Sequence, residues 1–321
     1  MRRTAVLALA AVLLTGSASA LFGRKEENAQ TAEGAPTVAA LEITTYRDVP
    51  CQGQFRVTAS EGEVTFAVAE EPEKGAVTVE GDTFTYTPEE GVTGSDSFTY
   101  TATDSAGRTS LPAAVQVTIE KTKSGVCYAD TADSPAAAAA QYLAEAGIFT
   151  GAKIGENYYF EPDRTVSRSE FLALALETAG REVTDVTMTG FCDDESIPVW
   201  AKAYAAAGVA DGIVQGKTTA QGAAFQGEEP ITFSEAATVL NRMLNLGDVE
   251  LDVWFADREA VPSWAAQAVG NMEAMNVLAA GSFGSEQLEQ AVTRADAARM
   301  LCAAGTLLTG EESEGLLSWL K

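Results

Sequence analysis

Apolar and polar residues alternate along the chain between positions 64 and 119. The apolar members are mostly β-branched or aromatic, which is typical of half-buried strands whose side chains point to opposite faces in turn. Gly-, Pro- and Asp-containing turns separate the runs at the spacing of roughly 8–12 residues that marks an all-β domain. The runs are Val64/Phe66/Val68, Val77/Val79, Phe84/Tyr86, Phe98/Tyr100/Ala102 and Val115/Val117/Ile119. The pattern predicts an antiparallel β-sandwich over residues 36–120.

After Lys123 the alternation ends, and Ala-rich stretches with helical spacing run almost to the C-terminus. Three landmarks recur there in the same order: an aromatic-x-Asp start, a helix opened by Ser or Pro, and a second helix. The starts lie 63 and then 64 positions apart. They are Tyr128-Ala129-Asp130, Phe191-Cys192-Asp193 and Phe255-Ala256-Asp257. This period indicates three copies of one helix-loop-helix unit.

The second helix of each unit begins with a Ser or Thr followed three residues later by an acidic residue. This is the capping box, in which each side chain satisfies a backbone N–H of the first turn. In the third unit the shorter Asp296 replaces Glu, so we expect a poorer cap there. Apolar residues follow at helical spacing, and one helix pair cannot bury its apolar face alone. The units are therefore expected to pack together as an all-α bundle.

The first twenty residues have the layout of a secretory signal peptide. Arg2 and Arg3 precede the apolar run Ala5–Leu14, and Ala18-Ser19-Ala20 is an A-x-A cleavage signal. The following residues, 21–35, are polar without a period and are expected to be a flexible leader. No later stretch approaches the roughly 18 apolar residues of a membrane helix. We therefore expect a secreted protein with no membrane span.

Composition excludes several classes of function. The formal net charge of −25 disfavours nucleic acid as a partner, so an anionic ligand needs a local cluster of Arg or Lys. The chain has no His, which removes Ser-His-Asp catalysis and His-ligated zinc. None of the four cysteines forms a C-x-x-C pair, and no metal or cofactor is expected. Export permits disulfides, and Cys192 with Cys302 is the pairing we expect.

Residues 36–120 resemble the bacterial immunoglobulin-like or cadherin-like modules of surface proteins, on the strength of FTYTP and GVTGSDSFTYTATD. The resemblance implies an Ig-like sandwich and leaves its ligand open. Asp96 and Asp104 are candidate calcium ligands in the cadherin manner. The alternative, which we favour, is that both are turn residues that accept hydrogen bonds from their own backbone.

The helical units resemble S-layer homology repeats. In those repeats the order of motifs is aromatic-x-Asp, Trp-Ala, Gly-Ile-x-x-Gly, aromatic-x-Pro and Thr-Arg-Ala-Glu. The matching segments here are YAD…GIFTG…YFEP…SRSE in the first unit, FCD…VWAKA…TFSE in the second and FAD…SWAAQ…TRAD in the third. The resemblance implies a pseudo-threefold bundle of repeats at 125–181, 185–246 and 250–308, followed by a C-terminal tail, 309–321. It also implies a partner: secondary cell-wall polysaccharide, often pyruvylated, or peptidoglycan.

The copies are degenerate. Repeat one lacks the first-helix Trp and carries the alanine run 136–140, whereas repeat two has Phe233 where the family has Arg. Repeat two also has GKTTAQGAAF in place of a compact loop, and repeat three lacks the aromatic-x-Pro.

The candidate glycan-binding residues follow from the motif positions. Arg168 and Arg294 at the helix starts, with free N–H groups of the first turn, form an expected carboxylate site. Trp200 and Trp264 offer flat faces to sugar rings; the alternative, which we favour, is core packing against the second helix. The two arginines have the alternative of a local ion pair. The remaining candidates are the cap residues Ser167 and Thr293 and the motif glycines Gly151 and Gly212.

We therefore expect a non-catalytic cell-surface protein held to the wall by its repeats, with the Phe233 site silent for anions. Two alternatives remain open at this point. One is an adhesion module whose degenerate repeats make protein contacts. The other is a wall glycosidase that works through carboxylates.

Overall fold

The computed structural model describes residues 34–60, 62–255, 261–279 and 281–309. The predicted signal peptide, nearly all of the leader and the C-terminal tail, and Asp257 of the third aromatic-x-Asp start lie outside these residues. From Thr31 onward the chain forms one compact unit.

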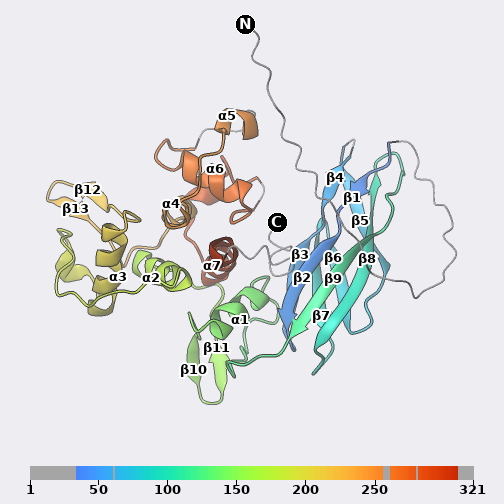
Figure 1. Ribbon diagram of the computed structural model, residues 1–321, viewed down its shortest axis with the longest axis horizontal. Helices are drawn as coiled ribbons and strands as arrows, with labels where there is room; N and C mark the ends of the chain where they lie inside the picture. The colour runs from blue at the N-terminus through green and yellow to red at the C-terminus, as the bar shows by residue number, and fades with distance from the viewer. Residues whose placement is uncertain (1–33, 61, 256–260, 280, 310–321) are drawn as a thin grey trace, which may run out of the picture. The chain divides into compact units, whose positions relative to one another are not determined.

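The N-terminal strands form a sandwich of two sheets (Figure 1). Buried and more exposed side chains alternate along strands such as β7 and β9, so one face of each strand packs in the core. The first sheet has the order β2-β9-β8-β5, the second has the order β3-β7-β6, and β1 pairs with β4 beside them. All pairings within the sheets are antiparallel except that of β2 with β9. The bounds are β1 Thr37–Val38, β2 Leu41–Tyr46, β3 Cys51–Gln54, β4 Val57–Ala59, β5 Val64–Glu70, β6 Gly75–Glu80, β7 Thr83–Pro88, β8 Gly94–Asp104 and β9 Ala113–Glu120.

Aromatic side chains fill the space between the two sheets. Phe55 stacks on Tyr100 with ring centroids 4.5 Å apart, and Phe84 meets Phe98 edge to face. The buried Tyr100 hydroxyl donates to the carbonyl of Ala39, which satisfies its polar end. The predicted strands are thus present as β5 to β9, while β1 to β4 are four strands that the alternation did not predict.

Asp96 and Asp104 are both committed to hydrogen bonds within the sandwich. Asp96 accepts from the backbone N–H groups of Glu73 and Lys74 and from the Tyr86 hydroxyl. Asp104 accepts from the N–H of Ala106 and from Arg108. Asp104 therefore has the expected turn role. Asp96 lies inside β8 and instead holds the distant Glu73–Lys74 turn, so the turn interpretation is wrong for this residue.

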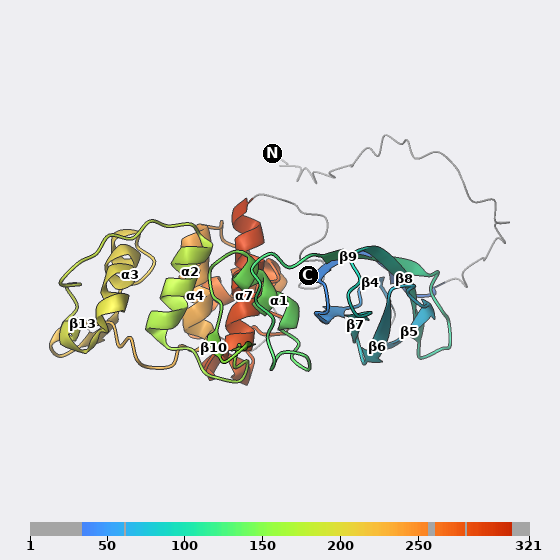
Figure 2. The same ribbon diagram turned by 90° about the horizontal axis from the view of Figure 1, so that it is seen from below.

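The helical region consists of three helix pairs, α1/α2, α3/α4 and α6/α7, named here the first, second and third pair. The second helices α2, α4 and α7 contact one another at the centre, as Figures 1 and 2 show. Each also contacts the first helix of the following pair: α2 with α3, α4 with α6, and α7 with α1. The bounds are α1 Ala137–Glu145, α2 Arg168–Thr178, α3 Val199–Ala210, α4 Phe233–Leu244, α5 Leu251–Trp254, α6 Ala266–Ala274 and α7 Arg294–Thr309.

Two pairs carry a β-hairpin between their helices. In the first pair the hairpin is β10 Ala152–Ile154 with β11 Asn157–Tyr159, and in the second it is β12 Lys217–Thr219 with β13 Gly222–Ala224. The segment GKTTAQGAAF is therefore the counterpart of the first hairpin. A short 3-10 helix, η2 Glu286–Glu289, follows the loop of the third pair.

Three buried residues close the helical region into a ring of backbone hydrogen bonds. The Val166 N–H donates to the carbonyl of Val292, Val292 donates to Ile231, and Ile231 donates back to Val166, at 2.8–3.0 Å. All three side chains are at most 1% exposed. Each residue lies just before the second helix of its own pair, so the ring fixes the three helix starts around one axis.

The capping boxes form at all three helix starts. Ser167 with Glu170 and Thr232 with Glu235 exchange both hydrogen bonds. Thr293 and Asp296 do the same, at 3.1 and 3.2 Å. The expectation of a poorer third cap is therefore wrong, because the Thr293 backbone lies close enough for the shorter carboxylate.

The expected disulfide is not formed: all four cysteines are free thiols. Cys192 is exposed on the surface, whereas Cys302 is buried inside α7. Burial raises the pKa of the Cys51 thiol to about 12, so this thiol is protonated and unreactive at neutral pH.

Candidate functional site

The N-termini of the three second helices do not offer free N–H groups. In α2 the N–H of Arg168 donates to the carbonyl of Glu229 and that of Ser169 to Gly227, both in the second pair. In α7 the N–H of Arg294 donates to Arg164 of the first pair. Neighbouring carbonyls and the capping residues thus occupy the donors on which the predicted anion site relied, and the binding roles of Arg168 and Arg294 stay a prediction.

Arg168 connects the first pair to the second. Its Nε donates to the carbonyl of Phe225 at 3.0 Å, and its guanidinium forms a 2.9 Å ion pair with Glu235. The Arg168 side chain is only 11% exposed and the Glu235 side chain 13%. Arg168 therefore forms a largely buried ion pair between two helix pairs. The alternative of an ion pair describes this residue, but its partner is Glu235 of the next helix pair instead of a local residue.

Glu235 receives two cations as well as its capping hydrogen bond. Burial alone raises the pKa of its carboxyl, but the hydrogen bond from Lys217 and the charge of Arg168 outweigh burial and lower it below its usual range. Lys217 comes from β12 at 2.8 Å. The carboxylate is thus charged, and it holds two helix pairs and a hairpin together.

Arg294 makes the corresponding connection from the third pair to the first. Its guanidinium donates at 2.8 Å to the carbonyl of Phe160 and to Glu161, and it lies 5.1 Å from the centre of the Phe149 ring. Glu161 is half exposed, so this ion pair is more accessible to water than the ion pair of Arg168 with Glu235. Phe233, at the equivalent position of the second pair, is 7% exposed and packs as a core residue.

Trp200 separates two hollows on the surface between α2 and α3. The first has a volume of about 260 Å³ and is mainly apolar, with walls that include Phe149, Leu174 and Arg294. The second has a volume of about 370 Å³ and is polar, with walls that include Arg164 and Glu228. Trp200 and Glu170 line both hollows. The indole is 51% exposed, so the core-packing alternative does not describe it.

Arg164 is the exposed cation of this groove. Its guanidinium forms ion pairs with Glu170 at 2.9 Å and with Glu161 at 3.8 Å, and half of the side chain faces solvent. A guanidinium carries five donors in a fork that suits a carboxylate, and these two ion pairs leave part of that fork open. Arg164 lies two residues before Val166 of the backbone ring, a position that the repeat motif does not mark as a binding residue.

The equivalent positions of the other pairs differ. Trp264, two residues after a proline like Trp200, is 56% exposed. In the first pair Ala137 takes this place and is 1% exposed, within an alanine run that is buried throughout. The alanine run therefore provides a small-residue packing surface rather than a groove wall.

The predicted glycines and caps have structural roles. A Cβ at Gly151 would lie 2.2 Å from the carbonyl oxygen of Tyr159, and its φ is +67°, so only glycine fits at the base of this hairpin. Gly212 follows the end of α3 with φ of +71°. The Ser167 and Thr293 side chains are occupied by their capping hydrogen bonds.

Two aromatic residues were missed by the sequence analysis. Phe225 and Phe283 stack on Phe191 and Phe255, as Phe160 packs on Tyr128. The signal was the spacing from the start Asp, since Asp130 binds the N–H of Phe160 thirty positions on and Asp193 that of Phe225 thirty-two on. Phe283 therefore takes the place of the apparently missing aromatic in the third pair.

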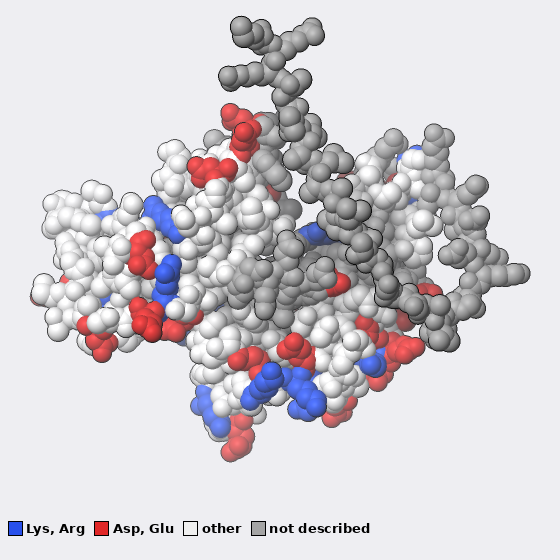
Figure 3. All heavy atoms as spheres, viewed as in Figure 1, with Lys and Arg blue, Asp and Glu red and all other residues white. Residues whose placement is uncertain are grey.

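Charge is distributed in small groups on the face shown in Figure 3, where blue basic groups lie next to red acidic ones. Within the described ranges, no group of His, Cys, Asp and Glu has metal-binding geometry. No helix among the same residues is long and apolar enough to cross a membrane.

Two family models match the chain. The bacterial cadherin-like domain matches residues 24–121, and the S-layer homology domain matches residues 128–172. The chain therefore carries a cadherin-like β domain followed by an S-layer homology domain. These domains are typically non-catalytic, and the second indicates anchoring at the cell surface. A search of curated proteins gives no match.

Solved structures resemble only part of the chain. Fibronectin(III)-like modules of Clostridium thermocellum CbhA are 18% identical over 27% of this chain and 99% of theirs, with a TM-score of 0.18. CopC from Methylosinus trichosporium is 10% identical over 27% of this chain and 96% of its own, with a TM-score of 0.21. A Bacteroides fragilis protein named as an alpha-galactosidase/melibiase is 15% identical over 27% of this chain, with a TM-score of 0.22. The match spans only 18% of that protein.

Proposed function

We propose that this chain is a non-catalytic surface protein that attaches to the cell wall by binding an anionic secondary polysaccharide in the groove around Trp200. The observation that carries the proposal is the half-exposed indole set between an apolar and a polar hollow. The S-layer homology match ends at residue 172, so it includes α1 and only the first residues of α2, which forms one wall of this groove. The three helix pairs are, in this proposal, three repeats of that family.

The chemistry of the groove suits an acidic sugar. An indole offers a flat apolar face to a sugar ring, and the open part of the Arg164 fork accepts a carboxylate such as that of a pyruvate ketal. The apolar hollow beside Phe149 and Leu174 has room for a methyl or ring face. Arg168 and Arg294 act in this proposal by holding the groove walls in place.

Trp264 offers a second stacking face of the same kind on the third pair. The first pair, with Ala137 buried, offers none. Two binding positions on one rigid ring give avidity for a repetitive polymer, because the second contact forms at high effective concentration. The cadherin-like domain is then the part that the anchor displays.

Co-sedimentation with wall sacculi, before and after chemical removal of the secondary polymer, tests the proposal. The mature chain should sediment with intact sacculi and lose this after removal. Trp200→Ala should weaken binding about tenfold or more, in line with a hot-spot aromatic. Val199→Ala is the matched control, since Val199 is 86% exposed and lines neither hollow.

The other outcomes distinguish the alternatives. Equal binding to stripped and intact sacculi identifies peptidoglycan as the ligand. Failure to sediment with either preparation overturns the anchor and leaves an adhesion module. Release of reducing sugar from sacculi identifies a glycosidase.

A further inference from the structure

Arg299 is a guanidinium without a partner in the described part of the chain. It lies on α7, its Nε is buried, and no hydrogen bond satisfies that nitrogen. The only carboxylate whose charge acts on it is Asp296, which is one turn earlier and occupied in capping Thr293. Burial lowers the pKa of Arg299, because the charged form is removed from water.

An unpaired buried guanidinium is unfavourable for folding. Proteins keep such groups where a ligand completes their hydrogen bonds, and strongly perturbed groups beside a cavity are candidate functional sites. Arg299 borders a hollow with a volume of about 680 Å³. That volume lies within the range of roughly 300–1,000 Å³ typical of small-molecule sites.

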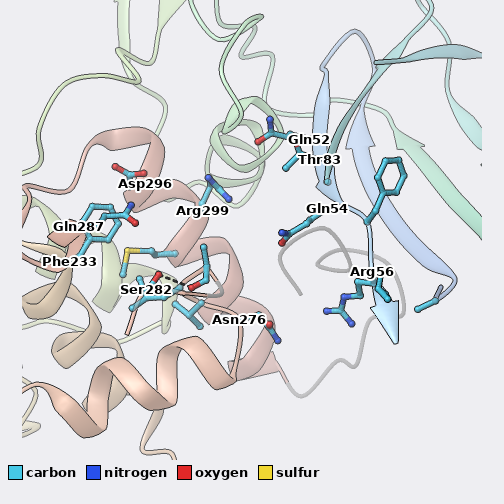
Figure 4. Close-up of a pocket in the computed structure, with 18 of the residues that line it drawn as sticks. Gln52, Gln54, Arg56, Thr83, Phe233, Asn276, Ser282, Gln287, Asp296 and Arg299 are labelled. Carbon is cyan, nitrogen blue, oxygen red and sulfur yellow. Dashed lines mark hydrogen bonds between the residues drawn. The ribbon is translucent and has the colours of Figure 1, made fainter. Parts of the chain in front are cut away.

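The lining of the hollow identifies the kind of ligand it suits. Figure 4 shows Arg299 reaching from α7 towards the open middle, with Gln54 on the facing strand β3. Amides of Gln52, Gln54, Asn276 and Gln287 lie around it, and Phe233 supplies an aromatic face. Amides satisfy sugar hydroxyl groups as both donors and acceptors, and a guanidinium binds a carboxylate.

The charges of the lining leave Arg299 available to an anion. Asp296, the carboxylate of the lining, is occupied in capping Thr293, and no described residue satisfies the Arg299 Nε. A neutral sugar offers the Arg299 guanidinium only hydroxyl oxygens, whereas a carboxylate also balances its charge and forms the stronger charge-assisted hydrogen bonds.

We infer that the Arg299 hollow is a binding site for a hexuronic acid residue, with the carboxylate on Arg299 and the ring hydroxyl groups on the surrounding amides. The site is separate from the Trp200 groove, with which it shares no lining residue. It therefore stands or falls independently of wall attachment through that groove.

Calorimetric titration of the mature chain with methyl β-D-glucuronide, and with methyl β-D-glucoside as the neutral match, tests the inference. The glucuronide should bind at least about tenfold more tightly than the glucoside, as expected for one charge-assisted hydrogen bond. Arg299→Met should lose about tenfold or more, and Arg299→Lys should lie between. Arg181→Met, the control, removes an exposed guanidinium that lines none of the three hollows, and it should bind the glucuronide as the unsubstituted chain does.

Thermal unfolding provides a readout that a purely structural arginine would not give. Without ligand, Arg299→Met should melt at the same temperature as the unsubstituted chain or higher, because it removes a buried unpaired charge. With the glucuronide, only the chain that keeps Arg299 should be stabilised. Equal affinity for both glycosides, no binding of either, or unchanged affinity in Arg299→Met overturns the inference.

Discussion

Two junctions between helix pairs are held by charge, and the third is held by an apolar side chain. Arg168 and Arg294 each reach a backbone carbonyl and a glutamate of a neighbouring pair. Phe233, at the same place in α4, is simply buried. All three junctions nevertheless share the same backbone ring of Val166, Ile231 and Val292.

The comparison shows that the backbone ring, rather than the side chain at the helix start, is the common element of the junctions. The side chain sets the strength of each junction and its dependence on solvent conditions. The glutamate partner of Arg168 is largely buried, whereas the glutamate partner of Arg294 is half exposed. The three junctions should therefore respond differently to substitution.

The largest effect is expected at the apolar junction. Phe233→Ala should lower the free energy of unfolding by about 3–5 kcal/mol, the usual cost of removing a buried phenyl group. Phe233→Leu, the control, should cost less than about 1.5 kcal/mol. Urea denaturation of the mature chain measures both. A loss below about 1 kcal/mol for Phe233→Ala would contradict apolar burial as the basis of this junction.

The next effect is expected at the enclosed charged junction. Arg168→Ala should cost about 2–3 kcal/mol, because it leaves the carbonyl of Phe225 without its donor and weakens the pairing of Glu235. Lys217 still pairs with Glu235, which keeps the loss below that of an isolated buried charge. Urea denaturation at neutral pH gives the value, with Arg168→Lys as the control that retains the charge.

The same substitution should lose part of its effect in acid. The pKa of Glu235 is lower in the folded protein than in the unfolded chain, where it is near 4.5. Its ionic stabilisation is therefore complete above pH about 5 and is lost as pH falls through the folded value. The cost of Arg168→Ala, measured by urea at a series of pH values, should shrink below pH about 4. A constant cost would show that Glu235 takes no part.

A smaller effect is expected at the more exposed charged junction. Arg294→Ala should cost about 1 kcal/mol, since the partner Glu161 is half exposed and water replaces much of the interaction. Added salt should reduce the cost further, which urea denaturation at low and high ionic strength can test. A cost equal to that of Arg168→Ala would remove the distinction between the two charged junctions.

The smallest effect on stability is expected within a single pair. Hydrogen bonds from Lys202 and Thr189 lower the pKa of Asp194 to about 2. Lys202→Met should raise this pKa towards the ordinary value near 3.9, because it removes the largest cause. An NMR titration of the carboxyl measures it. The unfolding midpoint should hardly change at neutral pH, and a large loss there would place this pair with the junctions.

Much of the secondary structure follows from local pattern. The strands β5 to β9 alternate, and the capping boxes are local signals that the structure confirms. The strand β2, LEITTY, shows almost continuous burial, so it has no alternation to detect. The edge strand β3 is only four residues long, which is too short for its sequence pattern to predict a strand.

The candidate site was less accessible to sequence reasoning, because its contacts cross between pairs. Core packing was the favoured interpretation for Trp200 and Trp264, and it is wrong, because both side chains are about half exposed. The partners of Arg168 and Arg294 lie in other pairs, at Glu235 and Glu161, which a motif within one repeat does not show. For the same reason the carbonyls that close the helix starts were not foreseen.

The ring of Val166, Ile231 and Val292 also determines when the helical region can acquire its core during synthesis. Val166 is synthesised first, yet its N–H can form its hydrogen bond only after Val292, whose carbonyl accepts it, has been synthesised. Closing so long a loop is entropically costly, and contacts of such sequence separation form late. A nascent chain that stops short of α7 holds two helix pairs with an open side. Proteolysis of ribosome-bound chains of increasing length should therefore give protection in one late step, as the last helix emerges.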